Sequence, residues 1–138
     1  MLRIEVTGLK QVANKLERLG ADARRLGTLA VAEVALEVER KAKEDAPFRN
    51  RTGTLRRSIH TEMTSEFEAT VKPATPYAVY VEYGTKPHKI RIRTPHGERV
   101  INHPGSKPYP YMKPAYEHGR EFAKDVVNRM VEQMIRGL

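Results

Sequence analysis

The chain has 138 residues, no cysteine and a formal net charge of +8 at pH 7. This length predicts one domain over residues 1–138 with a core of its own, and the lack of cysteine excludes a disulfide framework and a thiol nucleophile. No apolar run is long enough to span a bilayer, and the first ten residues lack the apolar region of a signal peptide. We therefore expect a protein made in a cytoplasm, with no membrane partner.

The positive charge is concentrated in two segments. Residues 46–58 carry a net charge of +4 and residues 88–113 carry +5, whereas residues 59–87 carry −2. Both basic segments have the composition of loops or hairpins, and the expected helices are balanced in charge. The pattern predicts contact with a polyanion or an acidic protein, and it argues against a helix that reads a DNA sequence.

The N-terminal third predicts one strand and two helices. Residues 3–7 alternate polar and apolar side chains, which is typical of a short half-buried strand. Apolar residues at helical spacing predict a helix over residues 9–19 and a longer one from about Gly27 to Asp45. Leu29 and Leu36 widen the apolar stripe of the longer helix, so we expect it to pack on more than one side.

The middle of the chain predicts a helical turn followed by two strands. Thr52 or Thr54 is expected to cap a single turn that includes Leu55, with Gly53 supplying a bend. Residues 59–65 and then residues 67–72 have the pattern of two antiparallel strands.

A tyrosine-rich stretch occupies residues 76–85. Tyr77, Tyr80 and Tyr83 recur every third residue, which predicts one or two helical turns with the rings on one side. Each ring has an apolar body to bury and a hydroxyl group that needs a partner, so the stretch suits either the edge of a core or a subunit contact. A core segment is the simpler interpretation.

The C-terminal half predicts a hairpin, an irregular loop and a helix. Residues 89–93 alternate strictly, residues 94–97 form a turn and residues 99–102 return, which makes a basic hairpin. The proline-rich segment after it precedes a helix over about residues 113–136. Together the elements predict an α+β fold, with a small central antiparallel sheet that includes the hairpin, packed by long N-terminal and C-terminal helices.

No set of residues predicts catalysis, cofactor binding or metal binding. His88, His96 and His103 lack the spacing that places two ligands on one helix face, although a hairpin could bring them together. The chain has neither a glycine-rich phosphate loop nor a nucleophile elbow. We therefore expect no catalytic residues, no cofactor, no metal and no enzymatic activity.

Three motifs in order carry a resemblance to a known family. They are Ala46-Pro47 followed by RTGTLRRSI (51–59), then YAVYVEYGT (77–85), then HPG (103–105) followed by PYMKPA (110–115). This ordered trio resembles the minor tail-component family of long-tailed bacteriophages, whose members are also called neck or tail-completion proteins. The resemblance extends over residues 1–138, but the basic hairpin matches no pattern of that family.

The resemblance implies a non-enzymatic structural virion protein of the tail or neck. Such a protein joins or completes the tail at the head–tail junction as a homo-oligomeric ring around the DNA path, and it assembles in the host cytoplasm. Its implied partners are connector or stopper proteins, tail-tube or terminator proteins, and passing DNA through contacts that are not sequence-specific. The alternative function is that of a small sequence-neutral nucleic-acid-binding protein that uses residues 88–113.

Two groups of residues are candidates for these roles. Glu82 can form an ion pair with Arg56 or Arg57 of the same or an adjacent subunit, or it can face solvent. The expected interface or organising residues are Tyr77, Tyr80, Glu82, Tyr83, Gly84, Thr52, Gly53 and Leu55. The expected lining of a DNA channel is Arg56, Arg57, Arg91, Arg93 and Arg99.

Overall fold

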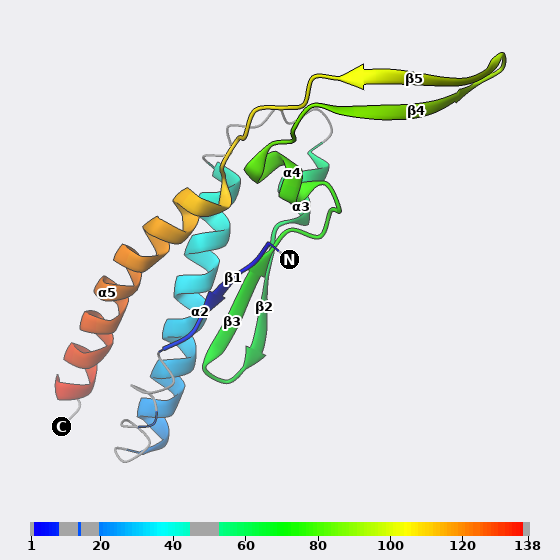
Figure 1. Ribbon diagram of the computed structural model, residues 1–138. Coiled ribbons are helices and arrows are strands. Elements are labelled where there is room, and N and C mark those ends of the chain that lie inside the picture. Colours follow the sequence, from blue (N-terminus) through cyan, green and yellow to red (C-terminus); the bar gives the residue numbers. More distant parts are fainter. Residues whose placement is uncertain (1, 9–13, 15–19, 45–52, 137–138) are drawn as a thin grey trace.

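The computed structural model describes residues 2–8, 14, 20–44 and 53–136 (Figure 1). The fold is α+β, as expected, and the predicted helix over residues 9–19 lies mostly outside the described residues. The elements are β1 (Ile4–Val6), α2 (Ala21–Glu44), α3 (Thr54–Ser58), β2 (His60–Ser65), β3 (Glu68–Lys72), α4 (Ala78–Tyr83), β4 (His88–Thr94), β5 (Gly97–His103) and α5 (Met112–Arg136).

A three-stranded antiparallel sheet forms one side of the core. Its strand order is β1-β3-β2, so the N-terminal strand pairs with β3 at one edge. Ile4 lies opposite Val71 and Val6 lies opposite Ala69, and all four side chains are buried. The alternation predicted from the sequence therefore gives the sheet one apolar face, and that face packs on α2.

The two long helices run antiparallel, side by side, and α2 lies between α5 and the sheet (Figure 1). This confirms the expectation that α2 packs on more than one side, since its stripe from Val31 to Ala42 is buried. Leu29 and Leu36 remain 57% exposed, however, so the widest part of the predicted apolar arc is not covered by the described residues. No helix in the described part of the chain has the length and apolar character that crossing a membrane requires.

The start of α2 differs from the prediction, whereas the bounds of α5 agree with it. Helix α2 begins at Ala21, after Gly20 in a left-handed conformation, rather than at Gly27, because the intervening residues are themselves good helix formers. Helix α5 spans Met112–Arg136, as predicted, and Val126 and Met130 face the core.

The basic hairpin does not join the central sheet, and the expectation that it would is wrong. Strands β4 and β5 form a separate two-stranded sheet that extends away from the helices (Figure 1). Neither face of the hairpin is apolar enough to form part of the core, because polar or charged side chains occur on both faces. The turn at Pro95-His96 matches the prediction, and Gly97 there has a φ of 117° that suits glycine.

Candidate functional site

Helix α4 holds the start of α5 through a buried carboxylate. Glu82 is only 4% exposed. Its Oε2 accepts hydrogen bonds from the backbone N–H groups of Tyr111 at 2.7 Å and Met112 at 2.9 Å, and its Oε1 accepts one from Lys113 at 2.9 Å. The first N–H groups of a helix have no partner within the helix and carry a partial positive charge. Glu82 therefore caps a helix that begins 30 residues further along the chain.

This arrangement differs from both expectations for Glu82 within one subunit. The carboxylate does not face solvent, and its described hydrogen bonds go to backbone N–H groups rather than to Arg56 or Arg57. A helix N-terminus supplies several oriented donors at once, so a buried carboxylate there needs no arginine as counter-ion.

Tyr111 ties the same two segments together from the other side. Its ring is 2% exposed and its hydroxyl donates a hydrogen bond to the carbonyl oxygen of Ala78 at 3.2 Å. Burial raises the pKa of this phenol far above its ordinary value, and the negative charge of Glu82 raises it further. The hydroxyl therefore stays protonated and keeps its role as a donor.

Two glycines allow the ends of the hairpin to meet. The backbones of Thr85 and Ser106 exchange two hydrogen bonds, of 3.0 and 3.1 Å, and Gly84 and Gly105 lie beside them with φ values of 72° and 82°. A Cβ at Gly84 would lie 2.5 Å from the carbonyl oxygen of Ser106, and one at Gly105 would collide with that of Thr85. We call residues 84–85 with residues 105–106 the clasp. Only glycine fits at both of its positions.

The first motif contributes a short helix with a glycine at its start. Leu55 of α3 is buried at 4% exposure, and Gly53 is the N-cap residue with a φ of 73°. Thr54 is already the first residue of the helix, so the expectation that it caps the turn is wrong, and Thr52 lies outside the described residues. The left-handed conformation of Gly53 sets the bend into the helix.

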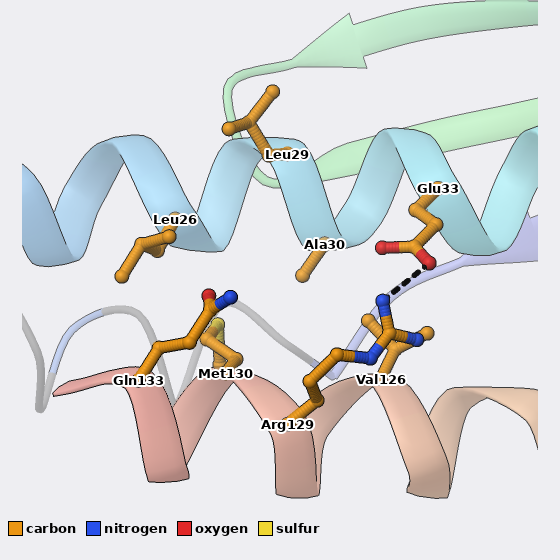
Figure 2. A pocket seen from close by; sticks show the side chains of 8 residues that line it. All are labelled: Leu26, Leu29, Ala30, Glu33, Val126, Arg129, Met130 and Gln133. Carbon is orange, nitrogen blue, oxygen red and sulfur yellow. Dashed lines mark hydrogen bonds and ion pairs between the residues drawn. The ribbon is translucent and has the colours of Figure 1, made fainter. Parts of the chain in front are cut away.

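A shallow groove separates α2 from α5 (Figure 2). Its volume is about 150 Å³, and the ion pair between Arg129 and Glu33, at 2.9 Å, joins the two helices beside it. Leu26, Ala30, Val126 and Met130 lie between the helices, and Leu29 points away from α5 (Figure 2). The lining of the groove contains no pairing of nucleophile and base.

The sequence model of one protein family, described as "Bacteriophage HK97-gp10, putative tail-component", matches residues 10–84. The chain belongs to this family. The match covers the first motif and all of the second except Thr85, so the hairpin, the third motif and α5 lie beyond it. No curated protein and no solved structure matches the chain significantly.

Membership confirms the resemblance found in the sequence and makes the chain a structural component of a bacteriophage tail. Two of the three motifs of this tail component meet in the fold, since residues 77–85 contact residues 105–113 through Glu82, Tyr111 and the clasp. One sign of this contact was visible in the sequence, namely a single acidic residue in an otherwise uncharged helix.

Tyr77, the N-cap residue of α4, and Tyr80 and Tyr83 within this helix are exposed, which corrects their interpretation as core residues. Tyr77 is 44% exposed, Tyr80 is 58% exposed and Tyr83 is 69% exposed. The helix buries Ala78 and Glu82 instead, and the three-residue spacing turns the rings to the other side. We call Tyr77, Tyr80 and Tyr83 the tyrosine face.

A groove of about 490 Å³ adjoins this face of the tail component. Tyr83 and Tyr116 line it together with Pro108, Pro110 and Leu2. Aromatic and proline side chains of this kind form contact surfaces more often than catalytic sites, because they offer rigid apolar area with few reactive groups.

The predicted channel arginines do not share one surface. Arg57 is exposed and Arg56 is half-buried on α3, whereas the other three lie on the hairpin. The strand register places Arg91 and Arg93 on one face of the hairpin and Arg99, opposite Ile92, on the other. A single lining built from all five side chains is therefore not what this subunit presents.

Of His88, His96 and His103, only the first and the last lie close together. The rings of His88 and His103 lie opposite each other across the hairpin, with centroids 4.9 Å apart, whereas His96 is in the turn at the far end. Among the described residues, no group of three histidine or carboxylate side chains is placed to hold a metal ion.

Proposed function

We propose that this tail component is a non-enzymatic subunit of a ring at the head-proximal end of the tail, around the path of the DNA. The observation that carries the proposal is the tyrosine face. Three neighbouring aromatic rings are 44–69% exposed on a helix whose other side is fixed by buried hydrogen bonds. Large apolar rings on a rigid element favour association, since they lose little conformational entropy when they are covered.

Two further features support association through more than one surface. Leu29 and Leu36 are each 57% exposed on α2, seven residues apart and therefore on the same side of the helix. The hairpin extends away from the body of the subunit, so it is placed to reach a neighbour (Figure 1). A ring needs two different surfaces on each subunit, one for each neighbour.

The proposed partners are other copies of this chain and the proteins on either side of the ring, namely a connector or stopper protein and a tail-tube or terminator protein. Assembly would take place in the host cytoplasm before the particle is complete. The net charge of +8 allows contacts with DNA phosphates that are independent of sequence.

The oligomeric state tests this proposal. Size-exclusion chromatography with light scattering should give a ring-sized species for the parent, alone or after mixing with connector or tail-tube subunits. Replacing Tyr80 and Tyr83 together with alanine should release monomers whose thermal unfolding matches that of the parent, because both rings are exposed in the subunit. Met63→Ala, a 42% exposed side chain on β2, is the control and should assemble normally.

A parent chain that stays monomeric under all these conditions would refute the ring. The second candidate function is sequence-neutral nucleic-acid binding, and the hairpin row of Lys89, Arg91 and Arg93 supports it. A monomer that binds mixed-sequence duplex DNA tightly, with a steep dependence on salt concentration, would favour this function instead.

A further inference from the structure

One face of the hairpin carries a row of cations along β4. Lys89, Arg91 and Arg93 alternate with the isoleucines, and residues two apart on a strand project from the same face about 6.7 Å from each other. All three side chains are exposed, and no described carboxylate lies within ion-pair distance of them, although Glu98 is opposite Arg93 in the strand register. We call these three cations the basic row.

The outer side of α5 carries a row of carboxylates at a matching pitch. Glu117, Glu121 and Asp125 are four residues apart, which places them about 6 Å from each other along the helix and within about a quarter of its circumference. We call them the acidic row. Asn128 and Glu132 continue it, and all five side chains are exposed.

The acidic row faces away from the core. Val126 and Met130, which pack against α2, lie on the opposite side of α5. Glu121 forms an ion pair with Lys124 at 3.1 Å. Both side chains are about 70% exposed, so the pair is weak and a cation of a partner can replace Lys124. No described cation pairs with Glu117 or Asp125. The contacts within the subunit therefore leave the row available to a partner.

We propose that the basic row of one subunit lies along the acidic row of a second copy of this chain. The proposal rests on the proposed function, because it names one contact through which neighbouring subunits join. Opposite charges at nearly equal spacing can form three adjacent ion pairs without distortion of either element. The hairpin extends away from the helices, so its own α5 is not positioned to receive it (Figure 1).

The hairpin also has a physical need for such a support. A two-stranded hairpin is marginally stable in water when nothing packs on it. Val100, on the same face as the basic row, is 58% exposed, and a neighbouring helix would cover it. The contact joins two different surfaces of the chain. Each subunit can therefore bind one neighbour through its hairpin and a second neighbour through its α5. Repetition of this contact closes a ring if the rotation between neighbouring subunits permits.

A charge-swap experiment on the full chain tests the contact. The variant K89E/R91E/R93E and the variant E117K/E121K/D125K should each weaken association about 100-fold, because three attractive pairs become repulsive. The variant that combines all six changes should assemble again. Arg99→Glu, on the other face of the hairpin, is the matched control and should assemble as the parent does. Circular dichroism and thermal unfolding check that each variant is folded.

If a charge-reversed variant does not fold, the neutral set K89Q/R91Q/R93Q and E117Q/E121Q/D125N replaces it, with a smaller loss of association expected. A parent that assembles while either reversed variant assembles equally well would overturn the hairpin contact but leave the ring intact. The contact is also overturned if both reversals dissociate the oligomer and their combination does not restore it. A parent that never assembles would refute the proposed function itself.

Binding of DNA is the competing explanation of the basic row, and the same variants distinguish it. Mixed-sequence duplex DNA is the probe. If the row acts on DNA alone, K89E/R91E/R93E loses duplex binding but keeps the oligomer. This result contradicts the hairpin contact.

Discussion

A buried carboxylate is tolerated at Glu82 because backbone N–H groups at the start of α5 solvate it as water would. Three hydrogen bonds of 2.7–2.9 Å converge on its two oxygens, and the positive end of the helix dipole adds to them. The same contact, together with the Tyr111 hydrogen bond to Ala78, fixes α4 against the start of α5 and so orients the tyrosine face. Loss of the charge should therefore affect the stability of the whole junction.

We predict that Glu82→Gln lowers the free energy of unfolding by about 2–3 kcal/mol. The amide keeps the shape of the carboxyl group but has one acceptor oxygen in place of two, and its NH₂ group would face backbone N–H groups. Urea unfolding of the monomer measures the change. Glu62→Gln is the control, since Glu62 is exposed on β2 and the loss of its ion pair to Lys72 should change the stability much less. Equal losses in the two variants would contradict the capping role.

Glu37 makes the stability of the fold depend on pH. The Arg40 guanidinium bonds to its carboxylate at 2.6 and 2.9 Å, and this contact, with a smaller contribution from His118 of α5, lowers the pKa of Glu37 from 4.5 to about 2. A carboxyl group with a lowered pKa in the folded state stabilises the fold above its unfolded value near 4.5. That stabilisation is lost as the pH falls toward 2.

We predict that Glu37→Gln removes part of the acid sensitivity of the protein. The variant should be about 1 kcal/mol less stable than the parent at pH 7, because Arg40 is half-exposed and solvent screens the pair. The difference should disappear by about pH 2, where the carboxyl group becomes protonated in the parent as well. Thermal unfolding at several pH values measures it, and a difference that does not change with pH would show that the ion pair does not contribute.

At the scale of elements, α2 and α5 are in close contact where α5 has a glycine. A Cβ on Gly119 would lie 2.5 Å from Cγ2 of Val38, and both residues are buried. The side chain of Val38 has little freedom to move, because a β-branched residue in a helix has one strongly preferred rotamer. The absence of a side chain at Gly119 therefore sets the distance between the two helices.

We predict that Gly119→Ala destabilises the protein by about 1–3 kcal/mol, although alanine is the better helix former. Overpacking against Val38 is the reason. In the Val38→Ala background the same substitution should be neutral or stabilising, since the obstructing methyl groups are gone. A double-mutant cycle by chemical unfolding measures this coupling, and strictly additive effects would refute the close contact.

The sequence predicted the positions of helices and strands better than it predicted which of their side chains are in contact. The periodic patterns of β1, α5 and the hairpin placed these elements within a residue or two, because local spacing determines them. Spacing alone did not show which side of α4 is buried, because Ala78 and Glu82 lie on one side of it and the larger tyrosines on the other. The capping role of Glu82 depends on a helix 30 residues away, and no local pattern carries that information.

At the scale of the whole molecule, the hairpin lies outside the core that the other elements form. The central sheet, α2 and α5 share one core, and the clasp closes the chain below the hairpin. His88 and His103 lie directly opposite each other, so a two-residue turn can join them. The hairpin can therefore be removed without opening the fold.

We predict that replacing residues 89–102 with an Asn-Gly turn leaves the melting temperature of the monomer within about 5 °C of the parent, since no core residue is lost. The same deletion should abolish assembly. Circular dichroism and light scattering on one preparation measure both outcomes. A shortened chain that unfolds, or one that still forms the parent's oligomer, would contradict this division of the molecule.

The clasp has a mechanical consequence. Gly84 and Gly105 are in close contact with the backbone of the opposite segment. The two strands therefore cannot slide past each other at the base of the hairpin, and they must rotate together as a lever. Strands of seven residues give this lever an arm of about 20 Å, so a rotation of about 10° at the base would move the tip by about 4 Å. A single methyl group added at Gly84 or Gly105 would thus displace the tip, far from the substitution.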